Sequence, residues 1–100
     1  MKSIIFASLL VAAASGQAAD ITPDAVRSLA ATCATCHGTN GRAVNGGGMA
    51  PLAGMDKSTL LRALTEYRAG TRPATLMHQI SKGYTDAQLD AIAGYFAAQK

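Results

Sequence analysis

The sequence predicts an all-α domain built from three to four short helices with long connections. Three stretches carry apolar residues at the spacing of one helix face, and residues that favour a helix start precede each of them. A glycine-rich segment separates the first stretch from the second. No run alternates apolar and polar residues as a half-buried strand would, so we expect helices joined by loops.

The first helix is expected to begin at Thr22-Pro23-Asp24, which combines a capping hydroxyl, a proline in the first turn and an acidic residue. Its apolar face consists of Val26, Leu29, Ala30 and Cys33. The helix should end near His37, where a loop with six glycines begins and runs over residues 38–54. Long loops in small domains are usually functional, and these glycines can let the backbone pass close to a flat ring.

The second helix should run from about Ser58 to Ala69, with Asp56 or Ser58 as its cap and Gly70 at its end. We then expect a short helical piece over residues 71–82, with Leu76, Met77 and Ile80 as its apolar members.

The last helix has the clearest start, because Thr85-Asp86-Ala87-Gln88 is a capping box. Its apolar stripe follows at helical spacing and consists of Leu89, Ile92, Ala93 and Phe96. Gly94 and the neighbouring alanines predict a close crossing with another helix.

Residues 1–19 have the order of a secretory signal peptide: a positive start, an apolar run and a segment of small residues. Cleavage near Ala18 or Ala19 would leave residues 20–100 as a periplasmic domain. The alternative is an uncleaved anchor, but the apolar run is shorter than the roughly 20 residues that a spanning helix needs. Loss of Lys2 would leave eight basic and six acidic side chains, scattered without the basic stripe of a nucleic-acid binder.

A domain of this size buries too little apolar surface to be stable without a staple. Its two cysteines are only three residues apart, so a disulfide between them would constrain little. A large apolar cofactor would solve the problem better. Cys33-Ala34-Thr35-Cys36-His37 is the C-x-x-C-H pattern of covalent haem attachment, in which both thiols bond one haem c and the histidine reaches its iron.

Two alternatives for this motif remain open. Zinc could use Cys33, Cys36, His37 and His78, although neighbouring Cys36 and His37 fit a tetrahedral site poorly. A thiol-redox site would need a strand and helix around the two cysteines, and that context is missing.

The second axial ligand is expected to be Met77, because it lies about 40 residues after His37, far enough for the chain to return on the other haem face. His78 is the alternative, and Met49 and Met55 are read as core fillers. The free ring nitrogen of His37 should donate to a carbonyl in the acceptor-rich segment around Pro51.

With His37 and Met77 on the iron, both axial positions are filled and one-electron transfer is the predicted function. The other class of function is a catalytic or gas-binding haem, which would require Met77 not to be bound.

In this order, the first helix with its motif, the Pro51-Leu52-Ala53-Gly54 turn, Met77 and the final helix with Tyr95-Phe96 resemble a class I cytochrome c. The resemblance narrows to the cytochrome c4 group over residues 36–41, over the segment from Gly70 through Met77 to Asp86, and over residues 93–96. Within this group, the same stretches resemble more closely the cytochrome subunit of flavocytochrome c sulfide dehydrogenase, here in a monohaem form.

This resemblance implies a sulfide-oxidising flavoprotein (FAD) partner that passes electrons singly to the haem. Those subunits usually carry two haems, whereas this chain has one motif. The alternative is a free-standing periplasmic shuttle to a terminal oxidase or another redox enzyme.

Overall fold

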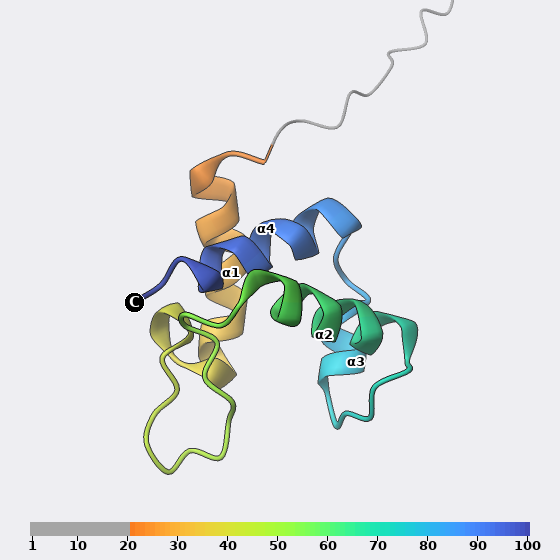
Figure 1. The fold of residues 1–100 in the computed structure, drawn as a ribbon, viewed down its shortest axis with the longest axis horizontal. Helices are drawn as coiled ribbons and strands as arrows, with labels where there is room; N and C mark the ends of the chain where they lie inside the picture. Colours follow the sequence, from red (N-terminus) through yellow and green to blue (C-terminus); the bar gives the residue numbers. More distant parts are fainter. Residues whose placement is uncertain (1–20) are drawn as a thin grey trace, which may run out of the picture.

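The computed structural model describes residues 21–100, so the predicted signal peptide lies outside the described residues. The described part is helical and contains no strand (Figure 1). In chain order its elements are α1 (Pro23–His37), a short 3-10 helix η1 (Thr39–Gly41), α2 (Lys57–Ala69), α3 (Met77–Ser81) and α4 (Asp86–Ala97). The all-α prediction is therefore confirmed. Within residues 21–100, none of the helices has the length and apolarity needed to cross a membrane.

The ends of α1 and α4 lie where the sequence places them. Thr22 Oγ1 accepts a hydrogen bond from the Ala25 N–H at 3.2 Å, and Gly38 ends α1 with a φ of 84°. At the start of α4 both bonds of the capping box are formed, with the Gln88 N–H bonded to Thr85 Oγ1 and the Thr85 N–H bonded to Gln88 Oε1. Each cap satisfies donors that a helix leaves unpaired in its first turn, so these helices begin at fixed residues.

Helix α2 begins one residue earlier than expected, at Lys57, because Asp56 is its cap and accepts from the Thr59 N–H at 3.0 Å. It ends as expected at Gly70, whose left-handed conformation (φ 77°) closes the last turn.

The prediction of a helical piece over residues 71–82 is wrong for its first half, since α3 starts only at Met77. Pro73 disfavours helical backbone at Arg72, and the segment instead folds back on the end of α2. The Thr71 N–H bonds the Glu66 carbonyl at 3.0 Å, and Arg72 Nε bonds the Glu66 carboxylate at 2.8 Å. Leu76 and Ile80, two of the three apolar residues expected in this piece, are exposed.

Seven buried side chains form a small core where α1, α2 and α4 meet: Ala30, Leu60, Leu64, Leu89, Ile92, Ala93 and Phe96. Ala30 and Ala93 bring α1 and α4 close together, as Figure 1 shows. Gly94 does not serve that crossing, because a Cβ at this position would meet the Lys57 side chain of α2 at 3.7 Å, an ordinary contact. A ring of partly buried apolar residues surrounds the core, so the protein alone leaves this apolar surface incompletely covered.

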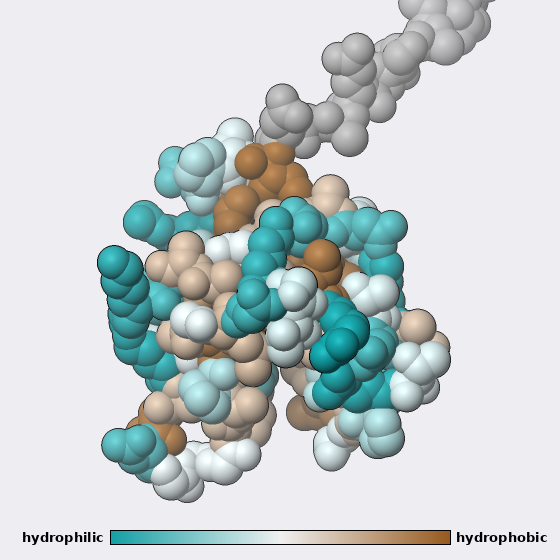
Figure 2. Space-filling model, viewed as in Figure 1, coloured by the Kyte–Doolittle hydropathy of each residue, from teal (hydrophilic) through white to brown (hydrophobic). Residues whose placement is uncertain are grey.

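The lower part of the molecule divides into two lobes in Figure 1. One lobe is the loop over residues 38–54, and the other consists of α3 with the segment 71–76 that leads into it. The space-filling view shows that the surface is hollowed between them (Figure 2). Because α1 ends beside the first lobe, its last turn lies at the edge of this hollow.

Candidate haem site

Cys33 and Cys36 lie one turn apart near the end of α1, and both thiols are free. Residues three apart on a helix are neighbours on its surface. Cys33 is partly buried against the core, whereas Cys36 is exposed. Burial raises the pKa of the Cys33 thiol above its ordinary value. The two thiols therefore lie one turn apart on the same helix, where both can bond one group.

His37 is the last residue of α1, and its ring is held by the loop. Its Nδ1 atom lies 2.7 Å from the carbonyl oxygen of Ala50. A carbonyl oxygen carries no proton, so Nδ1 must be the protonated nitrogen and the donor. Nε2 is left with its lone pair and can bind a metal. The hydrogen bond expected from the sequence is thus present, and it comes from the segment around Pro51.

The loop that supplies this carbonyl is fixed at both ends by backbone hydrogen bonds. The Gly41 carbonyl accepts from the Leu52 and Ala53 N–H groups at 2.8 and 3.1 Å, and the Gly54 N–H donates to the Phe96 carbonyl at 2.9 Å. Gly41 has a φ of 76°, and a Cβ there would lie 2.7 Å from the Phe96 ring. The flat ring that this glycine approaches is therefore a phenylalanine of α4, a contact that the sequence did not identify.

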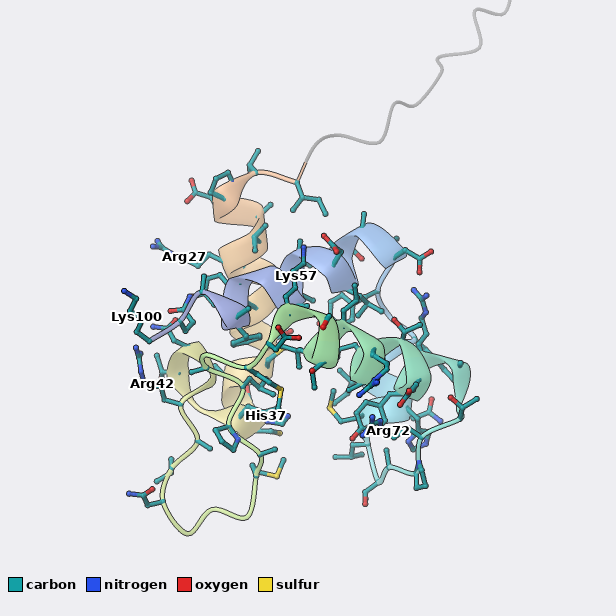
Figure 3. The ribbon with its side chains drawn as sticks, in the orientation of Figure 1. Arg27, His37, Arg42, Lys57, Arg72 and Lys100 are labelled. Atoms are coloured by element: carbon teal, nitrogen blue, oxygen red, sulfur yellow. The ribbon has the colours of Figure 1, made fainter. Side chains whose placement is uncertain are left out.

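Met77 is the first residue of α3 and packs, partly buried, against the core. His37 lies on the other side of the hollow in Figure 3, whereas Arg72, in the segment that leads into α3, lies on the same side as that helix. Of the other candidates, Met55 also packs against the core, and Met49 is 43% exposed on the loop. His78, the alternative ligand, is partly buried, and its Nδ1 has no hydrogen-bond partner among the described residues.

The sequence did not reveal two tyrosine hydrogen bonds that brace this region. Tyr84 Oη lies 2.7 Å from Thr32 Oγ1, and Tyr95 Oη donates to Asn40 Oδ1 at 2.7 Å. The partners in each bond are more than fifty residues apart in sequence. The sequence shows a tyrosine just before the last helix and another in its final turn, but nothing in it indicates their partners.

The residues at the hollow fit a covalent haem. Cys33 and Cys36 provide two free thiols at i and i+3, His37 provides an imidazole with Nδ1 bonded to Ala50, and Met77 provides a thioether on the facing lobe. Leu76 and Met49 are exposed apolar residues of the two lobes. In residues 21–100, the His, Cys, Asp and Glu side chains do not gather in a group of three or more that could hold a metal ion by themselves. Two further surface cavities, each of about 430 Å³, lie along α1 and are lined by neither His37 nor Met77.

Comparison with known proteins decides what kind of chain this is. The sequence profile named Cytochrome c matches residues 24–100, which is more than three quarters of the chain. The chain belongs to the cytochrome c family. Its cofactor is accordingly a covalently bound haem c, and a cytochrome c domain implies electron transfer.

Individual relatives of this cytochrome c domain are moderately similar. It is 31% identical over 106 residues to a thiosulfate dehydrogenase electron acceptor of Stutzerimonas stutzeri, an alignment that covers 98% of this chain and 49% of the relative. It is 36% identical over 69 residues to the cytochrome subunit of sulfide dehydrogenase of Chlorobaculum tepidum, covering 68% of this chain and 60% of that subunit. It is 34% identical over 76 residues to cytochrome c-554(548) of Halomonas halodenitrificans, covering 69% and 86% of the two chains. The chain thus spans about half to three fifths of the first two relatives.

Proposed function

We propose that this cytochrome transfers single electrons in the periplasm through a haem c that Cys33 and Cys36 attach and that His37 and Met77 ligate. The hydrogen bond between His37 Nδ1 and the Ala50 carbonyl carries the proposal, because it fixes the tautomer that presents Nε2 to iron. A carbonyl acceptor also makes the imidazole a stronger electron donor. Pro51 keeps the turn that carries this carbonyl in place.

The second ligand decides between electron transfer and catalysis. Haem c supplies a one-electron ferrous–ferric couple when bound, and thioether ligation favours the ferrous state. Met77 supports this assignment because it is partly buried, sits at the start of a helix and lies on the lobe that faces His37 across the hollow. With Met77 bound to the iron, substrate would have no place to bind there, so a catalytic or gas-binding haem would require Met77 to be displaced.

Export supports the same function. The residues before the described domain have the pattern of a cleaved signal peptide, and covalent haem on an exported domain suits the periplasm. Expression of the full chain in a bacterium with haem-attachment machinery should give a periplasmic protein whose mass equals residues 19–100 or 20–100 plus one haem. A cytoplasmic or membrane-bound product of full length would contradict this part of the proposal.

A sulfur-oxidising flavoprotein is the proposed electron donor. The sequence resemblance supports it, and two relatives are named as an electron acceptor of thiosulfate dehydrogenase and as a cytochrome subunit of sulfide dehydrogenase. A free shuttle to a terminal oxidase is the second candidate, favoured by the similarity to cytochrome c-554(548), which this chain covers over most of its length.

Spectra of the purified protein test the ligand set. Ferric protein at neutral pH should be low-spin and show the weak far-red band of sulfur bound to iron, and its alkaline pyridine spectrum should correspond to two thioether links. High-spin features without the far-red band would overturn the Met77 assignment.

Purification from the native source tests the partner. A stable subunit should copurify with a flavin-containing chain, and addition of sulfide to that complex should reduce the haem rapidly. A cytochrome that elutes alone and is not reduced rapidly by a sulfide-oxidising flavoprotein would favour the free shuttle.

A further inference from the structure

A single side-chain hydrogen bond joins the helix that carries the haem motif to the segment that carries Met77. Tyr84 Oη lies 2.7 Å from Thr32 Oγ1. The Thr32 hydroxyl donates its proton to the Leu29 carbonyl at 2.8 Å, so Tyr84 must be the donor in the bond between the two side chains. Over the described residues, no other hydrogen bond connects residues 71–85 with α1.

Tyr84 is firmly coupled to α3. The Gly83 N–H donates to the Ile80 carbonyl at 3.1 Å, and the Tyr84 N–H donates to the Ser81 carbonyl at 3.4 Å. These bonds continue the helical path of α3 as far as Tyr84. Movement of the tyrosine away from α1 would therefore move α3 with it.

The other end of the bond lies at the haem attachment. Thr32 directly precedes Cys33, and its Oγ1 is 4.0 Å from the Cys33 sulfur. The bond thus connects α1, which carries the two cysteines, to α3, which carries Met77.

Apart from the packing of Met77 and Tyr84 against the core and a 3.4 Å bond from Arg68 of α2 to the Tyr84 carbonyl, little else holds α3 on this side. The helix has only five residues and no side-chain cap at its start, and it packs chiefly on α2. A helix this short is not stable by itself. Tyr84 and Thr32 also line one of the two cavities of about 430 Å³, so the tyrosine ring is not packed tightly from that direction.

We propose that Tyr84 and Thr32 are positioning residues for Met77: their hydrogen bond holds α3 against the attachment helix and so keeps the methionine sulfur on the iron. This inference rests on the Met77 ligation proposed above. When the bond is lost, the state with Met77 displaced becomes more populated, and an external ligand reaches the iron more easily.

Imidazole binding to the ferric holoprotein tests the proposal, with Tyr84→Phe and Thr32→Val as variants. Each removes one hydroxyl and keeps the size of the side chain. Because a hydrogen bond of this kind changes an equilibrium by about fivefold, the apparent Kd for imidazole should fall by roughly that factor in either variant. The double variant should show no further fall, since both changes remove the same bond.

Tyr95→Phe is the matched control. It also removes a tyrosine hydroxyl with a 2.7 Å hydrogen bond, but this bond joins α4 to Asn40 at the start of the 38–54 loop and does not touch α3. It should lower the thermal unfolding midpoint about as much as Tyr84→Phe and leave the imidazole Kd within about twofold of the wild type. The proposal is overturned if Tyr84→Phe leaves the Kd unchanged, or if Tyr95→Phe shifts it equally. The wild-type far-red band separates this failure from failure of the ligand assignment, because that band must be present for Met77 to be a ligand at all.

Discussion

His37 Nδ1 donates a hydrogen bond to the carbonyl oxygen of Ala50 at 2.7 Å, across thirteen residues of sequence. This contact links the end of α1 to the return of the 38–54 loop. The loop is in turn fixed to Gly41 and to Phe96 by backbone bonds. The orientation of the proposed proximal ligand therefore depends on α4, through the Phe96 carbonyl and the glycine-rich loop.

Replacing Pro51 tests this dependence. Pro51→Ala frees the backbone next to the Ala50 carbonyl and should weaken the bond to His37, so the Nδ1 proton should exchange with solvent several-fold faster. The stability lost through greater freedom of the unfolded chain should be about 0.5 kcal/mol. Proton NMR of the ferrous holoprotein measures the exchange rate.

Pro73→Ala provides the comparison, because Pro73 lies in the exposed segment before α3 and outside the 38–54 loop. It should cost similar stability and leave the exchange of the His37 proton unchanged. Equal acceleration in both variants would mean that general loosening, and not the Ala50 carbonyl, controls this proton.

Removal of Met77 tests the distal ligand. Met77→Ala should abolish the far-red band, produce high-spin ferric iron and lower the reduction potential by on the order of 0.1 V, since axial ligands set haem potentials over a range of about 0.8 V. Absorption spectra and a redox titration with mediators measure these changes.

Met55→Ala is the matched variant, because Met55 is also partly buried against the core. It should reduce the free energy of unfolding by about 2 kcal/mol and retain the far-red band. Loss of the band in Met55→Ala, with its retention in Met77→Ala, would reverse the assignment.

The features that the sequence predicts correctly depend mostly on residues that are close together in the chain. Thr22 and Thr85 specify their helix starts through bonds to residues three positions away, so the pattern alone contains the information. The C-x-x-C-H motif is local in the same way. The predicted helical piece over residues 71–82 is wrong for residues 71–76, because Pro73 and the contacts with Glu66 at the end of α2 determine the path of this segment.

The contacts that complete the site were beyond such reasoning. Gly41 against Phe96 and Thr32 against Tyr84 join residues more than fifty positions apart, and no spacing rule pairs them. The bond from His37 to the Ala50 carbonyl was predictable for two reasons. A metal-bound histidine needs an acceptor for its other ring nitrogen, and Pro51 indicates a turn whose carbonyl groups are available.

The cap of α2 should make stability depend on pH. The hydrogen bond from the Ser58 hydroxyl, and then that from the Thr59 N–H, hold the pKa of the Asp56 carboxylate below its ordinary value of about 3.9. The ionised form is thus favoured in the folded state, so its contribution is fully present above the ordinary pKa and is lost as the pH falls through the lowered one. Asp56→Asn retains a good cap without a charge, so the advantage of the wild type should disappear in acid.

Denaturant titrations from about pH 6 to pH 2 measure that difference. Ser58→Ala removes the donor that lowers the pKa of Asp56 most. The stability of this variant should therefore begin to fall at a higher pH than that of the wild type. If the difference in free energy of unfolding between the wild type and Asp56→Asn does not change with pH, the charge of the carboxylate does not contribute to stability.

Gly41 and Gly46 should respond very differently to the same substitution. Both have positive φ values, 76° and 81°, so alanine at either position is strained by about 1 kcal/mol. At Gly46 an added Cβ meets nothing within 4 Å, whereas at Gly41 it would lie 2.7 Å from the Phe96 ring and 2.9 Å from the Ala53 nitrogen. Gly41→Ala should therefore reduce the free energy of unfolding by about 3 kcal/mol, through overpacking as well as strain. The displaced loop carries the Ala50 carbonyl, so exchange of the His37 Nδ1 proton should also accelerate in Gly41→Ala. The exchange rate should stay unchanged in Gly46→Ala. Equal exchange rates in the two variants would contradict the coupling between Gly41 and His37.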